Sequence, residues 1–274
     1  MVVKKIIILL LKLAAGIAVL LVFTGCASIS AHLPWFRLSP DDVTVISDLA
    51  YDVNPHLGFT VYLTENGVLT PYLVLTNNYN GHTLLLRKYL LCELMRYDPE
   101  PPTTSGFAAY YGDSELGIFL DEVFIKSFSE TIQEIIVNSE IVITARHSLH
   151  ALADNDLVTI ERRVFLLSRY ETNARQNNRF LNEGERLRFF STSERRIAYN
   201  IDGVAISWWI RTPSITSSPY MAGIVNLWGG HSSAPVYNII GYVHLGVRPA
   251  FCLPNSTPVR RSVVNGEYVF LLYE

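Results

Sequence analysis

The stretch Pro71–Arg87, which reads PYLVLTNNYNGHTLLLR, decides the fold class of this chain. It holds two apolar runs, Pro71–Thr76 and Thr83–Leu86, on either side of the polar turn Asn78–Gly81. Asn-Gly is the strongest two-residue hairpin signal, because both positions tolerate a positive φ. A further run, residues 59–63, precedes a second Asn-Gly turn at residues 65–67. These signals predict an antiparallel meander of strands that opens the folded body near residue 58.

The middle of the chain predicts helices. Apolar residues recur at helical spacing over residues 116–124. Ser127 and Glu130 stand at capping-box spacing before a second short helix, residues 130–137. A strand over residues 164–167 stops at Ser168, and Ser168 with Glu171 forms another capping-box pattern. That pattern predicts a third helix from residue 169 to about residue 181.

The C-terminal quarter returns to strand patterns, at residues 205–210, 223–227, 243–253 and 268–272. Strands at both ends of a body with helices between them indicate an α+β fold. We therefore predict one α+β domain over residues 58–274.

The first 26 residues predict export. Three lysines within residues 4–12 precede an uncharged apolar run, residues 13–23, which ends in Thr24-Gly25-Cys26. A basic segment, a short apolar segment and small residues before a cleavage site are typical of a signal peptide. The cysteine after Gly25 resembles the lipobox of bacterial lipoproteins. That resemblance implies cleavage before Cys26 and acylation of the new terminus, with palmitate among the attached chains.

Two alternatives stay open for this segment, an uncleaved membrane anchor and ordinary secretion. All three place the body outside the cytoplasm. The lipoprotein interpretation divides the chain into a signal peptide at residues 1–25, a tether and lead-in at residues 26–57, and the domain at residues 58–274. We expect the protein to be lipid-anchored to the bacterial cell membrane through Cys26, on its extracytoplasmic side.

The composition of the chain limits the classes of partner that the protein can bind. Removal of residues 1–25 takes away three lysines and no acid, so the formal net charge changes from −3 to −6. An acidic body argues against nucleic acid as a partner. Cys92 and Cys252 then remain in the body. They either form one disulfide or stay separate thiols, and we expect separate thiols because both lie in apolar runs.

Five phrases carry a resemblance to a known family: residues 71–75, 83–89, 163–168, 208–213 (WWIRTP) and 246–250 (GVRPA). In this order they resemble the bacterial DUF6273 family over roughly residues 58–254. The resemblance implies a C-type-lectin-like domain of the formylglycine-generating-enzyme type. Such a domain has a twisted antiparallel sheet, two or three helices and long C-terminal loops. Its helical segment departs from the family pattern, because residues 112–120 lack the usual Trp and Arg.

The C-terminal part also supplies the candidate ligand-binding residues. Flat aromatic faces beside amide and guanidinium donors suit a glycan, a peptide or a small polar ligand. The candidates are Trp208, Trp209, Arg211, Asn226, Trp228, His231, Tyr237, Asn238 and Arg248. An alternative interpretation places the adjacent tryptophans in the core and gives the two arginines structural roles. The nine arginines between residues 162 and 196 are interpreted as a solvated surface.

Catalytic and metal-binding patterns are weak. His147 and His150 have helical ligand spacing with Asp154 and Asp156 nearby, but no motif fixes a third ligand, so we predict no metal site and no cofactor. Formylglycine-generating enzymes bind copper through a cysteine pair, and the sequence offers Cys252 only the distant Cys92. We expect a non-catalytic binding domain for a glycan, a peptide or an envelope protein. The alternatives are a degenerate formylglycine-generating-type modifying enzyme and a structural cell-envelope component.

Overall fold

The computed structural model describes residues 38–98, 109–149, 155–215, 220–236, 244–264 and 266–273. The predicted export segment with Cys26 lies outside these residues, as do Tyr237 and Asn238. The chain divides into two units, residues 1–38 and 39–274, and the second unit is described below. Within the ranges just given, no helix is long and apolar enough to span a bilayer.

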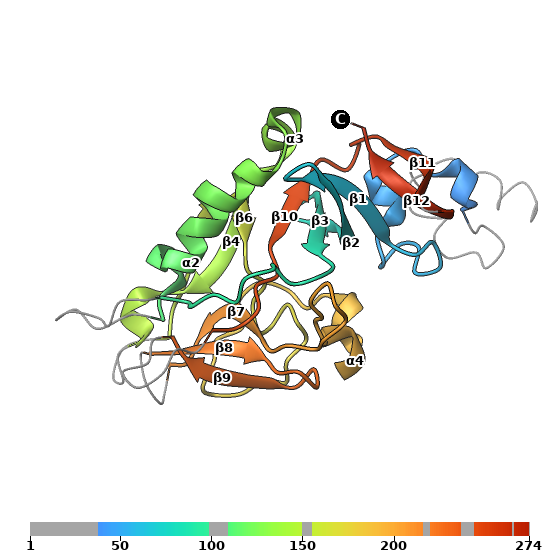
Figure 1. Ribbon diagram of the computed structural model, residues 1–274. Helices are drawn as coiled ribbons and strands as arrows, with labels where there is room; N and C mark the ends of the chain where they lie inside the picture. The colour runs from blue at the N-terminus through green and yellow to red at the C-terminus, as the bar shows by residue number, and fades with distance from the viewer. Residues whose placement is uncertain are drawn as a thin grey trace, which may run out of the picture. The chain divides into compact units, whose positions relative to one another are not determined.

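The second unit is α+β, mostly sheet with few and short helices, as the sequence predicts (Figure 1). Its main sheet has the strand order β11-β12-β1-β2-β3-β10-β6, and neighbouring strands are antiparallel except for the parallel pair β1 and β12. The strands are β1 Thr60–Glu65, β2 Val68–Tyr79, β3 His82–Arg87, β6 Val164–Phe165, β10 Ala250–Leu253, β11 Val259–Val264 and β12 Glu267–Leu272.

Two smaller sheets complete the strands. One pairs β4 Ser139–Thr144 with β5 Leu157–Arg162. The other has the order β7-β8-β9, with β7 Trp208–Pro213, β8 Met221–Val225 and β9 His231–Pro235. The sequence patterns indicated β7 and β8 but not the β4–β5 hairpin.

The predicted meander is confirmed. β1 and β2 meet at the pair Glu65↔Val68, and β2 and β3 meet at Tyr79↔His82. The turn residues Asn80 and Gly81 have φ values of 50° and 81°. Both central positions therefore adopt the left-handed conformation that made Asn-Gly a hairpin signal.

The helical segment over residues 116–124 is also confirmed, although it is irregular. An α turn, α2 Glu115–Ile118, continues as a π turn over Phe119–Val123 and a 3-10 turn over Phe124–Ser127. It lies along the β4 and β6 strands (Figure 1), and Asp121 Oδ1 accepts the backbone N–H of Val164 at 3.2 Å.

The second helix, α3, spans Glu130–Ile135 and is capped by Ser129 rather than Ser127. Ser129 Oγ accepts the backbone N–H of Ile132 at 3.4 Å. The other short elements are the helix α4 Ser193–Arg196 and the 3-10 turns Pro40–Asp42, Ile46–Leu49, Tyr111–Asp113, Arg146–Leu149 and Arg188–Ser191.

The predicted helix over residues 169–181 is wrong. The capping box itself forms: Ser168 Oγ accepts the N–H of Glu171 at 3.0 Å, and Glu171 Oε2 accepts the N–H of Ser168 at 2.8 Å. The chain then makes a single turn, and Asn173 has a φ of 61°, which stops a right-handed helix. Residues 174–187 follow without regular structure.

The compact unit begins at Ser39, earlier than the residue 58 predicted for the start of the body. Ile46, Leu49 and Ala50 are fully buried. The N–H of Ile46 bonds to the carbonyl of Thr257 at 2.8 Å, and that of Tyr51 to the carbonyl of Val74 at 2.9 Å. Apolar residues therefore attach the last part of the predicted lead-in, from about residue 43, to the main sheet.

Candidate ligand-binding cleft

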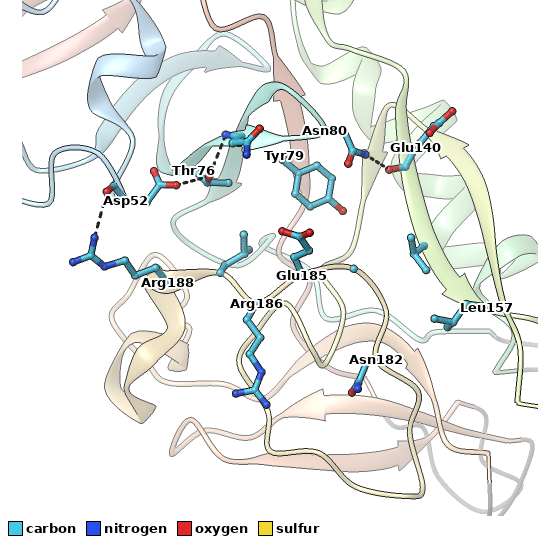
Figure 2. Close-up of a pocket in the computed structure, with 14 residues that line it drawn as sticks. Asp52, Thr76, Tyr79, Asn80, Glu140, Leu157, Asn182, Glu185, Arg186 and Arg188 are labelled. Carbon is cyan, nitrogen blue, oxygen red and sulfur yellow. Dashed lines mark hydrogen bonds between the residues drawn. The ribbon is translucent and has the colours of Figure 1, made fainter. Parts of the chain in front are cut away.

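A cleft of about 560 Å³ opens in the second unit. Its lining comes from the β2–β3 turn, the β4–β5 hairpin and the segment 182–188, with Asp52 at one end (Figure 2). This volume falls in the range of small-molecule sites, about 300–1,000 Å³. Three strands and one irregular segment thus converge on a space that can hold a ligand.

Tyr79, at the end of β2, is the aromatic residue of this lining. Its ring stacks on the buried ring of Phe165, with centroids 5.6 Å apart and planes at 23°. Its hydroxyl donates a hydrogen bond of 2.7 Å to Glu171 Oε1. Packing on one side and a hydrogen bond at the tip hold the ring in one orientation.

The Tyr79 hydrogen bond leads to a buried ion pair below the cleft. Arg211 in β7 donates to both oxygens of Glu171, at 2.7 and 2.8 Å, and also to the carbonyl of Leu166 at 2.8 Å. Neither side chain has any exposure. Burial by itself lowers the pKa of Arg211, but the charge and hydrogen bonds of Glu171, together with Tyr79 and Glu183, outweigh it and hold the pKa above its usual range.

Glu183 is the second carboxylate of this network. It lies 3.7 Å from the guanidinium of Arg211 and accepts hydrogen bonds from the N–H and hydroxyl of Thr144 and from the hydroxyl of Thr212, at 2.6–2.8 Å. Burial raises the pKa of Glu183, and Arg211 only partly offsets that effect. The network joins β4, β7 and the segment 182–188, so it fixes three parts of the structure against one another.

Gly184 connects the network to the cleft. Its φ is +75°, and a Cβ atom there would lie 2.5 Å from Glu171 Oε1. Only glycine fits such a position, because of both the backbone conformation and the close approach. The neighbours point in opposite directions: Glu183 into the network, and the exposed Glu185 into the cleft toward Tyr79 (Figure 2).

The remaining charged groups of the lining differ in how they are held. Asp52 Oδ2 accepts the hydroxyl of Thr76 at 2.5 Å, while its Oδ1 is enclosed and has no hydrogen-bond partner among the described residues. Arg186 is bound outside the cleft, to Asn173 Oδ1 and the Ala174 carbonyl, each at 3.1 Å. Arg188 donates to the backbone carbonyl of Asp52 at 3.4 Å.

The structure places four of the sequence-predicted site residues in the interior. Trp208, Trp209 and Arg211 are 0% exposed, and Arg248 is 2% exposed. The indole N–H groups are satisfied internally, by the carbonyl of Arg196 at 3.0 Å for Trp208 and that of Met95 at 2.8 Å for Trp209. These burials agree with the alternative interpretation, in which the tryptophans are core residues and the arginines structural.

Arg248 is held without a carboxylate. Its guanidinium donates to the carbonyls of Arg87 and Lys88, at 3.2 and 3.4 Å, and lies 5.2 Å from the Trp208 ring centroid. Its Nη1 has no hydrogen-bond partner within the described ranges. Burial lowers the pKa of Arg248 to about 9. Both arginines of the family phrases are thus buried, but the charge of Arg211 is balanced by a carboxylate, whereas that of Arg248 is met only by backbone carbonyls and an aromatic ring.

The other predicted residues lie near the β8–β9 turn. Trp228 is 73% exposed, and Asn226 Oδ1 accepts the N–H groups of Trp228 and Gly230 at 3.0 and 2.9 Å, so this amide shapes the turn. His231 is partly buried, with Nε2 2.9 Å from the hydroxyl of Thr172. The predicted set therefore does not form one exposed surface, and none of its described members lines the cleft.

Sequence reasoning missed the cleft residues Tyr79, Gly184 and Glu185. A signal for Tyr79 was present, because the turn Asn78–Gly81 holds an aromatic residue and amides beyond what a hairpin needs. No local signal marks Glu185, since its position depends on the direction that Glu183 takes toward Arg211.

The cysteines are separate free thiols, as predicted: Cys92 is exposed and Cys252 is buried in β10. Burial raises the pKa of Cys252 to about 12, which keeps it a neutral thiol. A copper site of the formylglycine-generating type needs two neighbouring thiolates, and these two residues do not fit it. His147 lies 2.8 Å from Asp156, both exposed, and the described residues contain no group of three metal-binding side chains.

Comparison with known proteins identifies a family but no individual relative. No curated protein and no solved structure matches the chain significantly. A family described as a domain of unknown function, DUF6273, matches residues 80–255, well over half of the chain. This match includes β3, most of the cleft lining and the whole network of Arg211, Glu171 and Glu183. The chain therefore belongs to the DUF6273 family.

Proposed function

We propose that this protein is an extracytoplasmic lipoprotein whose DUF6273 domain binds a ligand without catalysis, in the cleft beside Tyr79. The observation that carries the proposal is the cleft floor. Tyr79 and Gly184 line it, and both contact Glu171, whose buried ion pair with Arg211 fixes their position. A rigid, preorganised floor lowers the entropic cost of binding.

The fold part of the proposal is a C-type-lectin-like domain. Support comes from the family phrases and from an α+β unit whose main sheet is nearly all antiparallel. Comparison of an experimental structure of this domain with formylglycine-generating enzymes tests it directly: a different strand order would refute the assignment.

The anchor part rests on the sequence of residues 1–26. It is tested by expression of the full chain in a bacterial host with an alkyne-labelled fatty acid. The wild-type protein is expected to take up label and to sediment with membranes, whereas Cys26→Ala is expected to do neither. Sedimentation of an unlabelled, uncleaved protein would favour the membrane-anchor alternative.

The binding part is tested on an array of glycans and peptidoglycan fragments, with the full-length chain in detergent. Tyr79→Ala is expected to abolish any binding that the wild type shows, and Trp228→Ala is expected to retain it, because Trp228 lies outside the cleft lining. Thermal unfolding of both variants establishes that they are folded. If the wild type binds no class on the array, or if Trp228→Ala is the variant that loses binding, the cleft proposal fails.

A further inference from the structure

The charges inside the cleft indicate which ligand chemistry it takes, and this inference rests on the function proposed above. Five residues with charged side chains line the cleft, namely Asp52, Glu140, Glu185, Arg186 and Arg188. Their formal charges nearly cancel, because three are acidic and two are basic. The charge that a ligand meets does not cancel, because only some of these side chains are directed into the cleft.

Both arginines are engaged away from the middle of the cleft. The guanidinium of Arg186 bonds to Asn173 and Ala174 and stacks 4.9 Å from the Tyr170 ring centroid. In Figure 2 the Arg186 and Arg188 side chains both extend away from Tyr79. Neither is positioned to neutralise a carboxylate beside the Tyr79 ring.

Of the three carboxylates in the lining, that of Glu140 is directed away from Tyr79 (Figure 2), which leaves Glu185 and Asp52 to be considered. Glu185 makes no hydrogen bond or ion pair within the described part of the chain, and in Figure 2 its carboxylate is directed toward Tyr79. Asp52 keeps one enclosed oxygen, Oδ1, without a partner. Because this oxygen is enclosed, a ligand in the cleft does not reach it, and Glu185 is the carboxylate that a ligand N–H donor can contact.

The rest of the lining offers both polar groups and an apolar ring face. Asn78 lines the cleft, and its side-chain amide makes no hydrogen bond in the described structure, although its backbone N–H bonds to Thr76 Oγ1 at 3.1 Å. The Tyr79 ring offers a flat apolar surface. A sugar ring has C–H groups that pack on an aromatic ring and hydroxyls that bond to amides and carboxylates. We propose that the cleft binds an amino sugar with a free, protonated amine, which Glu185 recognises.

The test compares two probes that differ only at the amine. Calorimetry with the full-length protein in detergent uses a glucosamine oligomer and the N-acetylated oligomer of the same length. The glucosamine oligomer is expected to bind at least about tenfold more tightly, since only its free amine can form a charged hydrogen bond with Glu185. High salt is expected to weaken this binding but not to abolish it.

Glu185→Gln supplies the matched variant, and Glu134→Gln on α3, also an exposed glutamate, supplies the control. Glu185→Gln is expected to remove the preference for the free amine, while Glu134→Gln keeps it. Equal binding of both oligomers, binding of neither, or an unchanged preference in Glu185→Gln would overturn the amine inference. A different ligand on the array that is lost in Tyr79→Ala would still support the cleft function.

Discussion

Glu171 is bound by Arg211 through both carboxylate oxygens, at 2.7 and 2.8 Å, in a site with no exposure for either side chain. The pair joins the turn after β6 to the strand β7. It also explains why the capping box of Ser168 starts no helix. Glu171 is directed into the interior by Arg211 and Tyr79, and the positive φ of Asn173 then ends the right-handed turn.

Removal of Arg211 is expected to be one of the most destabilising single changes. Arg211→Met keeps much of the volume but leaves Glu171 and Glu183 buried without a compensating charge. Breaking a buried pair in this way costs about 3–5 kcal/mol. Urea unfolding measures the loss, and Arg179→Met, at an exposed position, serves as control. A loss below about 1 kcal/mol would show that the pair does not hold this part of the fold together.

Arg211→Lys is expected to rescue little of that stability. Lysine keeps the charge but cannot donate simultaneously to both oxygens of Glu171 and to the carbonyl of Leu166 with the same planar geometry. The unfolding free energies of the Lys and Met variants, measured side by side, separate the contribution of charge from that of geometry. Wild-type stability in Arg211→Lys would contradict the geometric argument.

Gly184→Ala tests the contact between the cleft floor and the network. A positive φ costs an alanine about 1 kcal/mol, and the Cβ would in addition lie 2.5 Å from Glu171 Oε1. Gly203→Ala is the matched control, because Gly203 has a φ of +80° and no atom near its Cβ position. We expect Gly184→Ala to lower the free energy of unfolding clearly more than Gly203→Ala does. Equal losses would mean that backbone conformation alone explains the glycine.

The environment of His231 predicts that the stability of the fold depends on pH. Burial, with Arg169 and Arg196 nearby, lowers the pKa of His231 to about 3 in the folded state, against an ordinary value of 6.5. The unfolded chain therefore takes up a proton between these values while the folded chain does not. The stability associated with neutral His231 is full above pH 6.5 and declines as the pH falls toward 3.

The measurement compares urea unfolding at pH 7 and pH 5 for the wild type and His231→Gln. The glutamine keeps a hydrogen-bonding group near Thr172 but does not titrate. The wild type is expected to lose about 1–2 kcal/mol more than the variant over this interval. The same pH dependence in both proteins would show that His231 is not held neutral.

Local sequence signals predicted the parts of the fold that depend on local chemistry. Asn80-Gly81 fixed the β2–β3 turn because its positive φ values are intrinsic to those residue types. The helix prediction for residues 169–181 failed because a long-range ion pair overrode a local capping signal. The site was missed for the same reason: Arg211 was a candidate ligand contact with a structural role as the alternative, and no local signal identified Glu171 as its partner.

The last prediction compares a buried tryptophan, Trp209, with an exposed one, Trp228. It distinguishes a ligand site at the β8–β9 turn, which the sequence predicted, from a site in the cleft. Trp209 is fully buried and bonded to Met95, so Trp209→Ala is expected to cost about 3–5 kcal/mol. Trp228 is 73% exposed, so Trp228→Ala is expected to change stability by at most about 0.5 kcal/mol. Urea unfolding checks both values. Because Trp228→Ala stays folded and leaves the cleft intact, a loss of ligand binding in that variant would move the site to the β8–β9 turn.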